Sequence, residues 1–432
     1  MSKFALLFAS VYFSGLFMSL FKGAHWAFYI YQLVYFLNPE KRWWSAGLPF
    51  SRYSLITVAV LFFAYMMQRK KFNYHLNEIR KLPQFKWIIM LLITYGLVYF
   101  SAVSKGLHYE AMIEYIKLFI VIGIAYKVVD TRKKLEYSIH AMIVGIAYLG
   151  FVTYSMGRDE FGRIGRFGMI DAPDANVAAA AMIASLPFLI FYFWRGSLKT
   201  KIIMTIFGAI IVNGLVLANS RGAFVGGGIA CVYFVWEMLR SKFKVRFQRI
   251  ITVFLIACGL VSLTIVIDTS FLERMSTLSD VSDGRKSGSN RVTFWVLTFD
   301  VLKEYPFGAG ASGYELLSPN YVPAEYFDRG KSVKAVHSIW FQALAEVSYI
   351  GFFFFMMIIY TTYRSLQKVR RYYWEKKDVY GYYFTHAILS SYIGVLVASS
   401  FINQFRTQIV YWLILFTACL FNIVMLRKKD NS

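Results

Sequence analysis

Hydrophobic runs of about 16 to 22 residues recur along almost the whole chain and restrict its fold more than any other feature. A run of this length matches the span of an α-helix across the hydrocarbon core of a bilayer. With 58% hydrophobic and only 16% charged residues among 432, the composition excludes an ordinary soluble globular protein and a disordered one. The runs occupy residues 4–21, 24–37, 53–68, 87–103, 111–128, 135–154, 176–194, 202–218, 222–239, 250–267, 337–360, 384–402 and 409–426. They predict an all-α, polytopic integral membrane protein with about 12 or 13 transmembrane helices, the first two forming a hairpin or a re-entrant pair.

The net charge of +23 is concentrated in six short loops between these runs. The loops hold 27 basic and 5 acidic residues and therefore carry +22. They are residues 69–86, 127–134, 195–201, 239–249, 364–378 and 427–432. Short loops rich in lysine and arginine face the cytoplasm, and these six alternate correctly with the runs. The charge is therefore interpreted as an orientation signal, and nucleic acid is not an expected partner. The C-terminus is predicted to be cytoplasmic, with residues 155–175, 219–221 and 268–336 on the outer side.

This topology divides the chain into four predicted parts. Residues 1–154 form the N-terminal transmembrane helices, and residues 155–267 form the central ones. Residues 268–336 form one large outer loop, and residues 337–432 form the C-terminal transmembrane helices. The three cysteines lie inside apolar runs, and no spacing indicates a disulfide, a metal site or a cofactor site.

The large outer loop contains one organised stretch, SGSNRVTFWVLTFDVLKEYPFGAGASGYEL. Ser289 or Asn290 can cap a helix, and residues 291–305 have the pattern of an amphipathic helix that lies against the bundle or the lipid headgroups. Pro306 stops this helix. The glycines that follow form a G-x-G-x-x-G string, which comes after a helix rather than a strand and therefore indicates a tight turn and not a dinucleotide site.

Polar residues on the outer side lie beside the predicted helix ends. Arg163 and Arg166 precede Asp174 and Asn176. Helix capping explains Asp174 and Asn176 as well as a direct functional role does. Arg221 lies at the outer boundary, where it either extends to the headgroups or binds a ligand.

His337 opens the apolar run 337–360 at its outer end. A neutral histidine at this position is either an interfacial residue or a general base. Glu346 follows nine residues later and points to the opposite face of an ideal helix, so packing or a hydrogen bond within the bundle is expected for it.

Arginines in three separate outer segments suit a diphosphate whose lipid tail stays in the bilayer, because the guanidinium group is always charged and binds phosphate with two hydrogen bonds. In glycosyl transfer from such a donor, the lipid diphosphate is the leaving group. Arginines beside it would stabilise the developing charge, as a divalent metal does elsewhere.

The order of the motifs RFGMIDAPDANVAAAAMI, LANSRGAFVGG, SNRVTFWVLTFDVLKEYPFGAGASGYEL and AVHSIWFQALAEVSYIGFFFF resembles the O-antigen ligase and polymerase superfamily. The resemblance covers residues 165–355. The N-terminal stretch YFLNPEKRWWSAGLPFSRYSLITVAV further resembles the O-glycosylation ligases that accompany exosortase systems. One departure is the family's E-x-G-x-x-G, which here has Ser348 in place of its first glycine and is interpreted as a close-packing position.

The resemblance implies a metal-independent glycosyltransferase of the GT-C type in the bacterial cytoplasmic (inner) membrane, with its active site facing the periplasm. Such enzymes move a glycan from undecaprenyl diphosphate to a hydroxyl of a glycan, lipid or protein acceptor. By motif position, Arg221 and Arg291 are implied to bind the donor diphosphate, and His337 to activate the acceptor hydroxyl. Asp174 and Asn176 match a further motif, with Arg163 and Arg166 as secondary candidates.

Two alternatives remain open at this point. A polymerase, which joins one lipid-linked repeat to another, shares the donor chemistry and differs in its acceptor. A transporter or flippase of lipid-linked glycans would use the same arginines and need no base, but the chain shows no repeated halves or paired broken helices of the kind found in transporters.

Overall fold

The computed structural model describes residues 2–157, 174–243, 245, 248–254, 256–257, 289–327 and 333–427. It is 81% helical, and its described part contains no strand. The helices are α1 (Lys3–Phe21), α2 (His25–Leu37), α3 (Tyr53–Gln68), α4 (Phe85–Leu97), α5 (Lys105–Val128), α6 (Arg132–Met156), α7 (Ala175–Ile183), α8 (Leu186–Arg195), α9 (Leu198–Ala218), α10 (Arg221–Arg240), α13 (Ser289–Glu304), α14 (Gly313–Tyr321), α15 (Ile339–Glu375), α16 (Val379–Ser399) and α17 (Gln408–Phe421). The protein is an all-α, multi-pass membrane protein, as the hydrophobic runs predict.

Twelve of the thirteen hydrophobic runs coincide with helices, and most of the remaining run, 250–267, lies outside the described residues. Seven described helical segments are long and apolar enough to cross a membrane, or eight if the bent pair that contains α4 is counted as one span. This is fewer than the predicted 12 or 13. One reason is that α2, α3 and α4 have only 13, 16 and 13 residues, and a bilayer span takes about 20.

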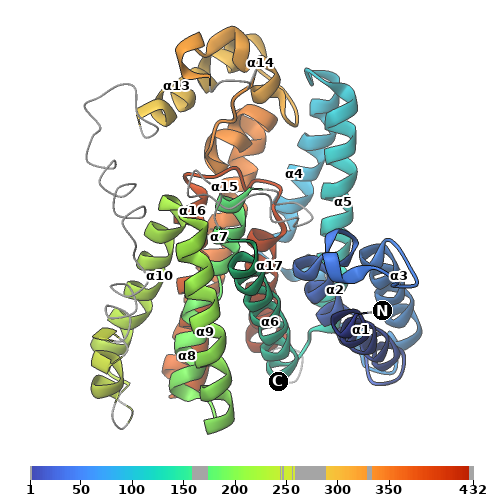
Figure 1. Ribbon diagram of the computed structural model, residues 1–432, viewed down its shortest axis with the longest axis vertical. Helices are drawn as coiled ribbons and strands as arrows, with labels where there is room; N and C mark the ends of the chain where they lie inside the picture. Colours follow the sequence, from blue (N-terminus) through green and yellow to red (C-terminus); the bar gives the residue numbers. More distant parts are fainter. Residues whose placement is uncertain are drawn as a thin grey trace.

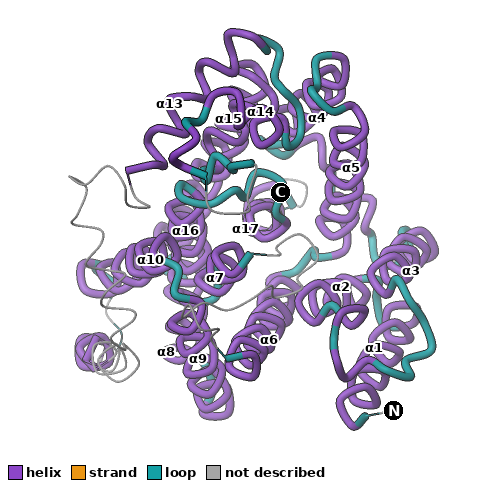
Figure 2. The backbone as a smooth tube through the Cα atoms, turned by 45° about the horizontal axis from the view of Figure 1, so that its top comes forward, coloured by secondary structure: helices purple, strands orange, loops and turns teal. Residues whose placement is uncertain are grey.

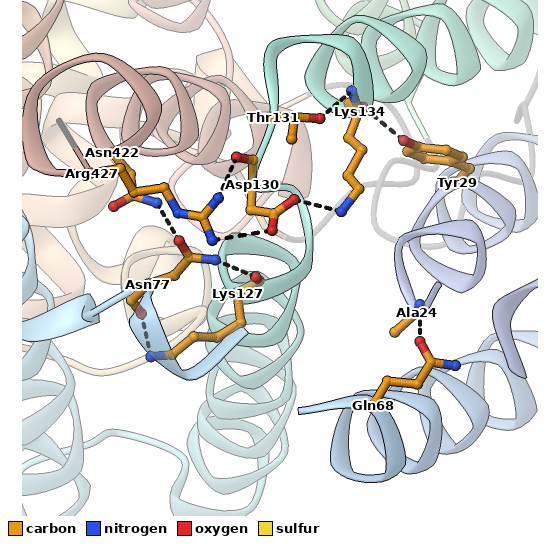
Figure 3. Close-up of polar contacts among 10 residues, drawn as sticks. All are labelled: Ala24, Tyr29, Gln68, Asn77, Lys127, Asp130, Thr131, Lys134, Asn422 and Arg427. Carbon is orange, nitrogen blue, oxygen red and sulfur yellow. Dashed lines mark hydrogen bonds and ion pairs between the residues drawn. The ribbon is translucent and has the colours of Figure 1, made fainter. Parts of the chain in front are cut away.

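The basic loops gather on one side of the molecule, called here the basic face and defined by the described parts of residues 69–86, 127–134, 195–201, 239–249, 364–378 and 427. Figure 3 shows part of it. Asn77 donates to the Lys127 carbonyl oxygen at 2.6 Å and accepts from Asn422 at 2.8 Å, and Arg427 pairs with Asp130 at 3.2 Å. Helices distant in sequence therefore end at the same level, as the charge pattern predicts.

The first two helices form a hairpin whose turn lies toward the basic face. The backbone N–H of Ala24 donates to Gln68 Oε1 at 2.9 Å, next to the first basic loop (Figure 3). At the other end, the Ser2 hydroxyl donates to the Trp44 carbonyl oxygen, and the Trp44 indole donates to the hydroxyl of Tyr148. The N-terminus thus lies on the face opposite the basic loops.

The centre of the bundle is formed by the two most enclosed apolar segments. The most apolar windows of residues 175–195 and 408–426 are each 83% buried, whereas that of α1 is 33% buried. Figure 2 shows α17 in the middle of the bundle with α7 and α16 beside it. Leu7, Phe17 and Phe21 of α1 are more than half exposed, which suits side chains that face lipid.

The face opposite the basic loops carries α13 and α14. Both pack on α15 and lie at the top of Figure 1, away from the C-terminus. The helix forms where the sequence predicts it, but α13 carries apolar residues on both its buried and its exposed sides, so its predicted amphipathic character is not found. Phe294 and Leu302 are buried at 4% exposure, while Val292 and Val296 on the other side are more than half exposed. The buried side lies against the bundle, so this face, called here the site face, holds an ordered cap.

Candidate functional site

The site face includes the start of α10, where the chain turns from α9. Asn219 adopts a left-handed conformation (φ 48°) that ends α9, and Ser220 is the N-cap of α10. The Ser220 hydroxyl makes no capping hydrogen bond. It is buried, and in the described part of the chain neither it nor Asn219 Nδ2 has a hydrogen-bond partner. A serine N-cap normally satisfies an amide of the first turn, so this helix start has donors available for an anion.

Arg221 is the first residue of α10 and is half-buried. The helix it begins packs closely on the end of α16. A Cβ added at Gly222 would lie 3.1 Å from Phe401 Cβ, and one added at Gly226 would lie 2.5 Å from the Gly394 carbonyl oxygen, so a larger residue at Gly226 would require α10 or α16 to shift. The close-packing explanation of the glycines in this helix is consistent with these contacts.

Arg291 lies in the first turns of α13, and its electrostatics relate it to two other predicted site residues. Burial lowers the pKa of the Arg291 guanidinium, the Arg221 charge lowers it further, and the Asp174 carboxylate opposes both. The charges of Arg221 and Asp174 therefore both act on Arg291, although the three residues come from α10, the N-cap of α7 and α13. Two half-buried guanidinium groups, one of which lowers the pKa of the other, are suited to an anion with more than one negative charge.

Asp174 performs the predicted capping role. Its Oδ1 accepts the backbone N–H of Asn176 at 2.7 Å and the Asn176 side-chain amide at 2.9 Å. The same carboxylate is the one that acts on Arg291. Asp174 therefore both caps α7 and acts on the charge of Arg291. Asn176 is linked to this group by its hydrogen bonds to Asp174.

His337 lies immediately before α15, with Ser338 as the N-cap. Its backbone is left-handed (φ 54°), a conformation that costs a residue other than glycine about 1–3 kcal/mol. Ser338 donates its backbone N–H to Asn403 Oδ1 at 3.1 Å, while its own buried hydroxyl has no partner in the described residues. His337 therefore lies at the start of α15, and the N-cap serine there, like Ser220 at the start of α10, makes no capping hydrogen bond with its hydroxyl.

The segment before His337 is attached to α13. The Trp295 indole N–H donates to the Val336 carbonyl oxygen at 3.1 Å, and its ring stacks on Phe341 with centroids 5.4 Å apart. Trp295 follows Arg291 by four residues, so both project from the same side of α13. The structure thus relates Arg291 electrostatically to Arg221 and Asp174, and it joins the segment before His337 to α13.

The glycine string forms the predicted tight turn and docks on α15. Gly308 and Gly310 have positive φ values of 102° and 76°. The backbone N–H of Ala309 donates to the Ala345 carbonyl oxygen at 2.9 Å, and the backbone N–H of Gly310 donates to the Glu346 backbone carbonyl oxygen at 3.2 Å. These carbonyl groups lose their helical partners because α15 is broken at Val347 and Ser348, so the turn supplies the donors that the break requires.

Ser348 shows why a glycine is expected at this position, and the close-packing interpretation of it was incomplete. Its backbone has φ 59° and ψ −174°, a region used almost entirely by glycine. Its hydroxyl donates to the Pro306 carbonyl oxygen, which ties the break to the glycine turn. Backbone conformation therefore accounts for this position, in addition to the close contact of Gly308 with Glu346 and Ser348.

Glu346 is a buried, hydrogen-bonded residue, in agreement with its predicted use within the bundle. Its side chain is 4% exposed and pairs with Arg406 at 3.3 Å. Gln342 Nε2 donates to Glu346 Oε1 at 2.9 Å, and the Tyr95 hydroxyl donates to Glu346 Oε2 at 3.2 Å.

A small cavity of about 10 Å³ adjoins the Glu346 carboxylate, with room for about one water. It is lined by Ser312, Tyr314, Glu315, Val336, Gln342, Ala345, Glu346 and Asn403. Burial raises the pKa of the Glu315 carboxyl, and the Glu346 carboxylate adds to this effect.

Two predicted candidates, Arg163 and Arg166, lie outside the described residues. In contrast, residues 400–407 between α16 and α17 carry Asn403 and Arg406, and no motif in the sequence pointed to them. The only available signal was their polarity in a short turn between two apolar helices on the side away from the basic loops.

Comparison with known families gives a match that covers part of this site. Residues 206–356 match the family model described as O-antigen ligase. The matched region includes Arg221, Arg291, His337 and Glu346, and it ends before residues 400–407. No curated protein matches the chain.

Proposed function

Because its O-antigen ligase domain places this chain in the O-antigen ligase and polymerase superfamily, we propose that it is a membrane glycosyltransferase of the GT-C type that uses an undecaprenyl-diphosphate-linked glycan as donor. The acceptor is a hydroxyl group of a glycan, lipid or protein. The site face is the periplasmic side of the bacterial cytoplasmic membrane, since the basic face has the composition of cytoplasmic loops.

The observation that supports the proposal is a helix start whose serine does not cap it, beginning at Arg221, whose charge acts on Arg291. Backbone amides at a helix start and two guanidinium groups are complementary to a diphosphate. The half-buried setting keeps these groups oriented before the reaction. Asp174 limits the positive charge, and Arg163 and Arg166 remain secondary candidates for the same diphosphate.

The proposed reaction breaks the bond between the anomeric carbon of the glycan and the diphosphate oxygen and forms a bond from that carbon to the acceptor oxygen. Negative charge develops on the leaving undecaprenyl diphosphate, where Arg221 and Arg291 stabilise it without a divalent cation. His337 in its neutral form takes the proton of the acceptor hydroxyl and later releases it to water.

In this proposal, residues 155–267 and the loop 268–336 form the catalytic core between the N-terminal helices 1–154 and the C-terminal helices 337–432. The core contributes both arginines, and His337 begins the C-terminal part. The donor's lipid tail remains in the bilayer, so the diphosphate reaches Arg221 at the membrane boundary.

The test is transfer by purified protein in liposomes that contain a donor of this class and a soluble hydroxyl acceptor. We expect release of undecaprenyl diphosphate in step with glycosylation of the acceptor, at the same rate in EDTA as in Mg²⁺. Movement of intact donor across the bilayer without its consumption would instead show a transporter. Consumption of donor that extends only other donor molecules would show a polymerase.

A further inference from the structure

A turn outside the region that matches the family model contacts all three elements that carry the proposed site. We call residues 400–407, between α16 and α17, the 400–407 turn. The Trp340 indole of α15 donates to the Ser400 hydroxyl at 2.8 Å, and Phe401 packs against Gly222, next to Arg221. The rings of Phe401 and Trp295 of α13 have centroids 6.4 Å apart. The helices that carry Arg221 and Arg291, and the helix that follows His337, thus all contact one short segment.

The contact nearest the chemistry is made by Asn403. Its Oδ1 accepts the backbone N–H of Ser338, the residue directly after His337. The Ser338 carbonyl group begins the hydrogen bonds of α15 by accepting from Gln342 at 2.8 Å. Asn403 therefore fixes the peptide unit between His337 and Ser338, and α15 fixes the next unit, between Ser338 and Ile339.

This fixation matters because His337 has a left-handed backbone. Such a conformation persists only where surrounding contacts impose it. If the Ser338 N–H lost its acceptor, the peptide could rotate, and the imidazole attached to His337 would change direction. A displacement of about 1 Å at a reacting group can cost about a hundredfold in rate.

The 400–407 turn is itself held firmly against α15. The backbone N–H of Phe405 donates to Gln342 Oε1 at 3.1 Å, and Arg406 pairs with Glu346 one turn further along the same helix. The Tyr411 hydroxyl donates to the Phe405 carbonyl oxygen at 2.7 Å. These bonds place Asn403 independently of its contact with Ser338, so Asn403 can impose a conformation on its partner.

We propose, on the premise of the proposed glycan transfer, that Asn403 is a positioning residue: by accepting the Ser338 N–H it holds His337 in the left-handed conformation that directs its imidazole to the acceptor hydroxyl. Asn403 does not touch the donor in this arrangement. Its loss affects the rate of transfer and leaves donor binding to the arginines.

The test compares Asn403→Ala, Asn403→Asp and His337→Ala in purified, reconstituted full-length protein. Asp retains an oxygen for the Ser338 N–H, whereas Ala does not. We expect Asn403→Ala to lower kcat for transfer by about a hundredfold, with an unchanged Kd for undecaprenyl diphosphate. Asn403→Asp retains more activity than Asn403→Ala.

The matched control is Asn422→Ala, which removes a buried asparagine hydrogen bond to Asn77 on the basic face. Comparable losses of Tm and of activity in Asn422→Ala and Asn403→Ala would reduce Asn403 to a structural residue and overturn the proposal. Wild-type kcat in Asn403→Ala, or equal losses in the Ala and Asp variants, would also overturn it. If His337→Ala keeps full activity, the general base of the proposed function fails, which is a separate outcome.

Discussion

The Arg406 guanidinium lies 3.3 Å from the carboxylate of Glu346, directly before the break in α15. The two residues are 60 positions apart and join the 400–407 turn to the helix that His337 precedes. A buried carboxylate that loses a cationic partner is strongly destabilising, whereas removal of both charges is much less so.

Arg406→Ala is therefore expected to destabilise the protein by about 3–5 kcal/mol, because it leaves Glu346 charged and buried. The double variant Arg406→Ala with Glu346→Gln restores part of the lost Tm, since Gln keeps a side chain of the same shape without the charge. Thermal unfolding of the purified variants in one detergent measures the order of Tm. A double variant less stable than Arg406→Ala alone would contradict the pairing.

The positive φ of Ser348 leads to a comparison between two small residues. Ser348→Gly and Ser348→Ala both remove the hydroxyl that donates to Pro306, but only Ala retains a Cβ in a region of backbone conformation that suits glycine. Ser348→Gly is expected to be more stable than Ser348→Ala by about 1–3 kcal/mol. Equal Tm values for the two variants would show that the backbone at this position does not have the strained conformation.

The positions of the membrane helices could be predicted from the sequence because hydrophobic length is a local property. The position of the basic loops on one side of the bundle could also be predicted, because the basic segments alternate with the hydrophobic runs along the sequence. The helix that carries Arg291 and the turn at Gly308 and Gly310 likewise follow from local patterns of apolar residues, proline and glycine.

The remaining features depend on contacts between distant segments. The position of Asn403 beside Ser338 requires the packing of α15 against α16 and α17, which no local pattern states. Ser348 has no glycine to reveal its positive φ, and the partner of Glu346 lies in a turn without a motif. Several apolar runs form helices shorter than a bilayer span, so among the described residues seven segments, or eight with the bent pair, meet the criterion of length and hydropathy.

Arg221→Ala and Arg291→Ala are each expected to weaken binding of undecaprenyl diphosphate by about tenfold or more, because each removes charge-assisted hydrogen bonds from the proposed diphosphate site. Lysine at either position restores only part of the affinity, since it cannot bind two oxygens in a fixed plane. Binding to reconstituted protein at fixed salt is the measurement. The control is Arg371→Ala, an arginine with 82% exposure near the basic end of α15. An unchanged Kd in either site variant would exclude that arginine from the diphosphate site.

Asp174→Asn separates capping from electrostatics. Asparagine caps a helix about as well as aspartate does, so the start of α7 is retained, while the negative charge that opposes Arg291 is lost. We expect tighter binding of undecaprenyl diphosphate, with a gain that shrinks as salt is raised. Affinity equal to wild type at low salt would leave Asp174 with its capping role alone.

The most direct measurement is single-turnover transfer by His337→Ala in reconstituted protein, together with its Kd for undecaprenyl diphosphate. Loss of a general base is expected to slow transfer by about 10²–10⁴-fold. Because Arg221 and Arg291 remain in place, the Kd is expected to stay at the wild-type value. Transfer at the wild-type rate by His337→Ala would contradict the role of His337 as the base that activates the acceptor.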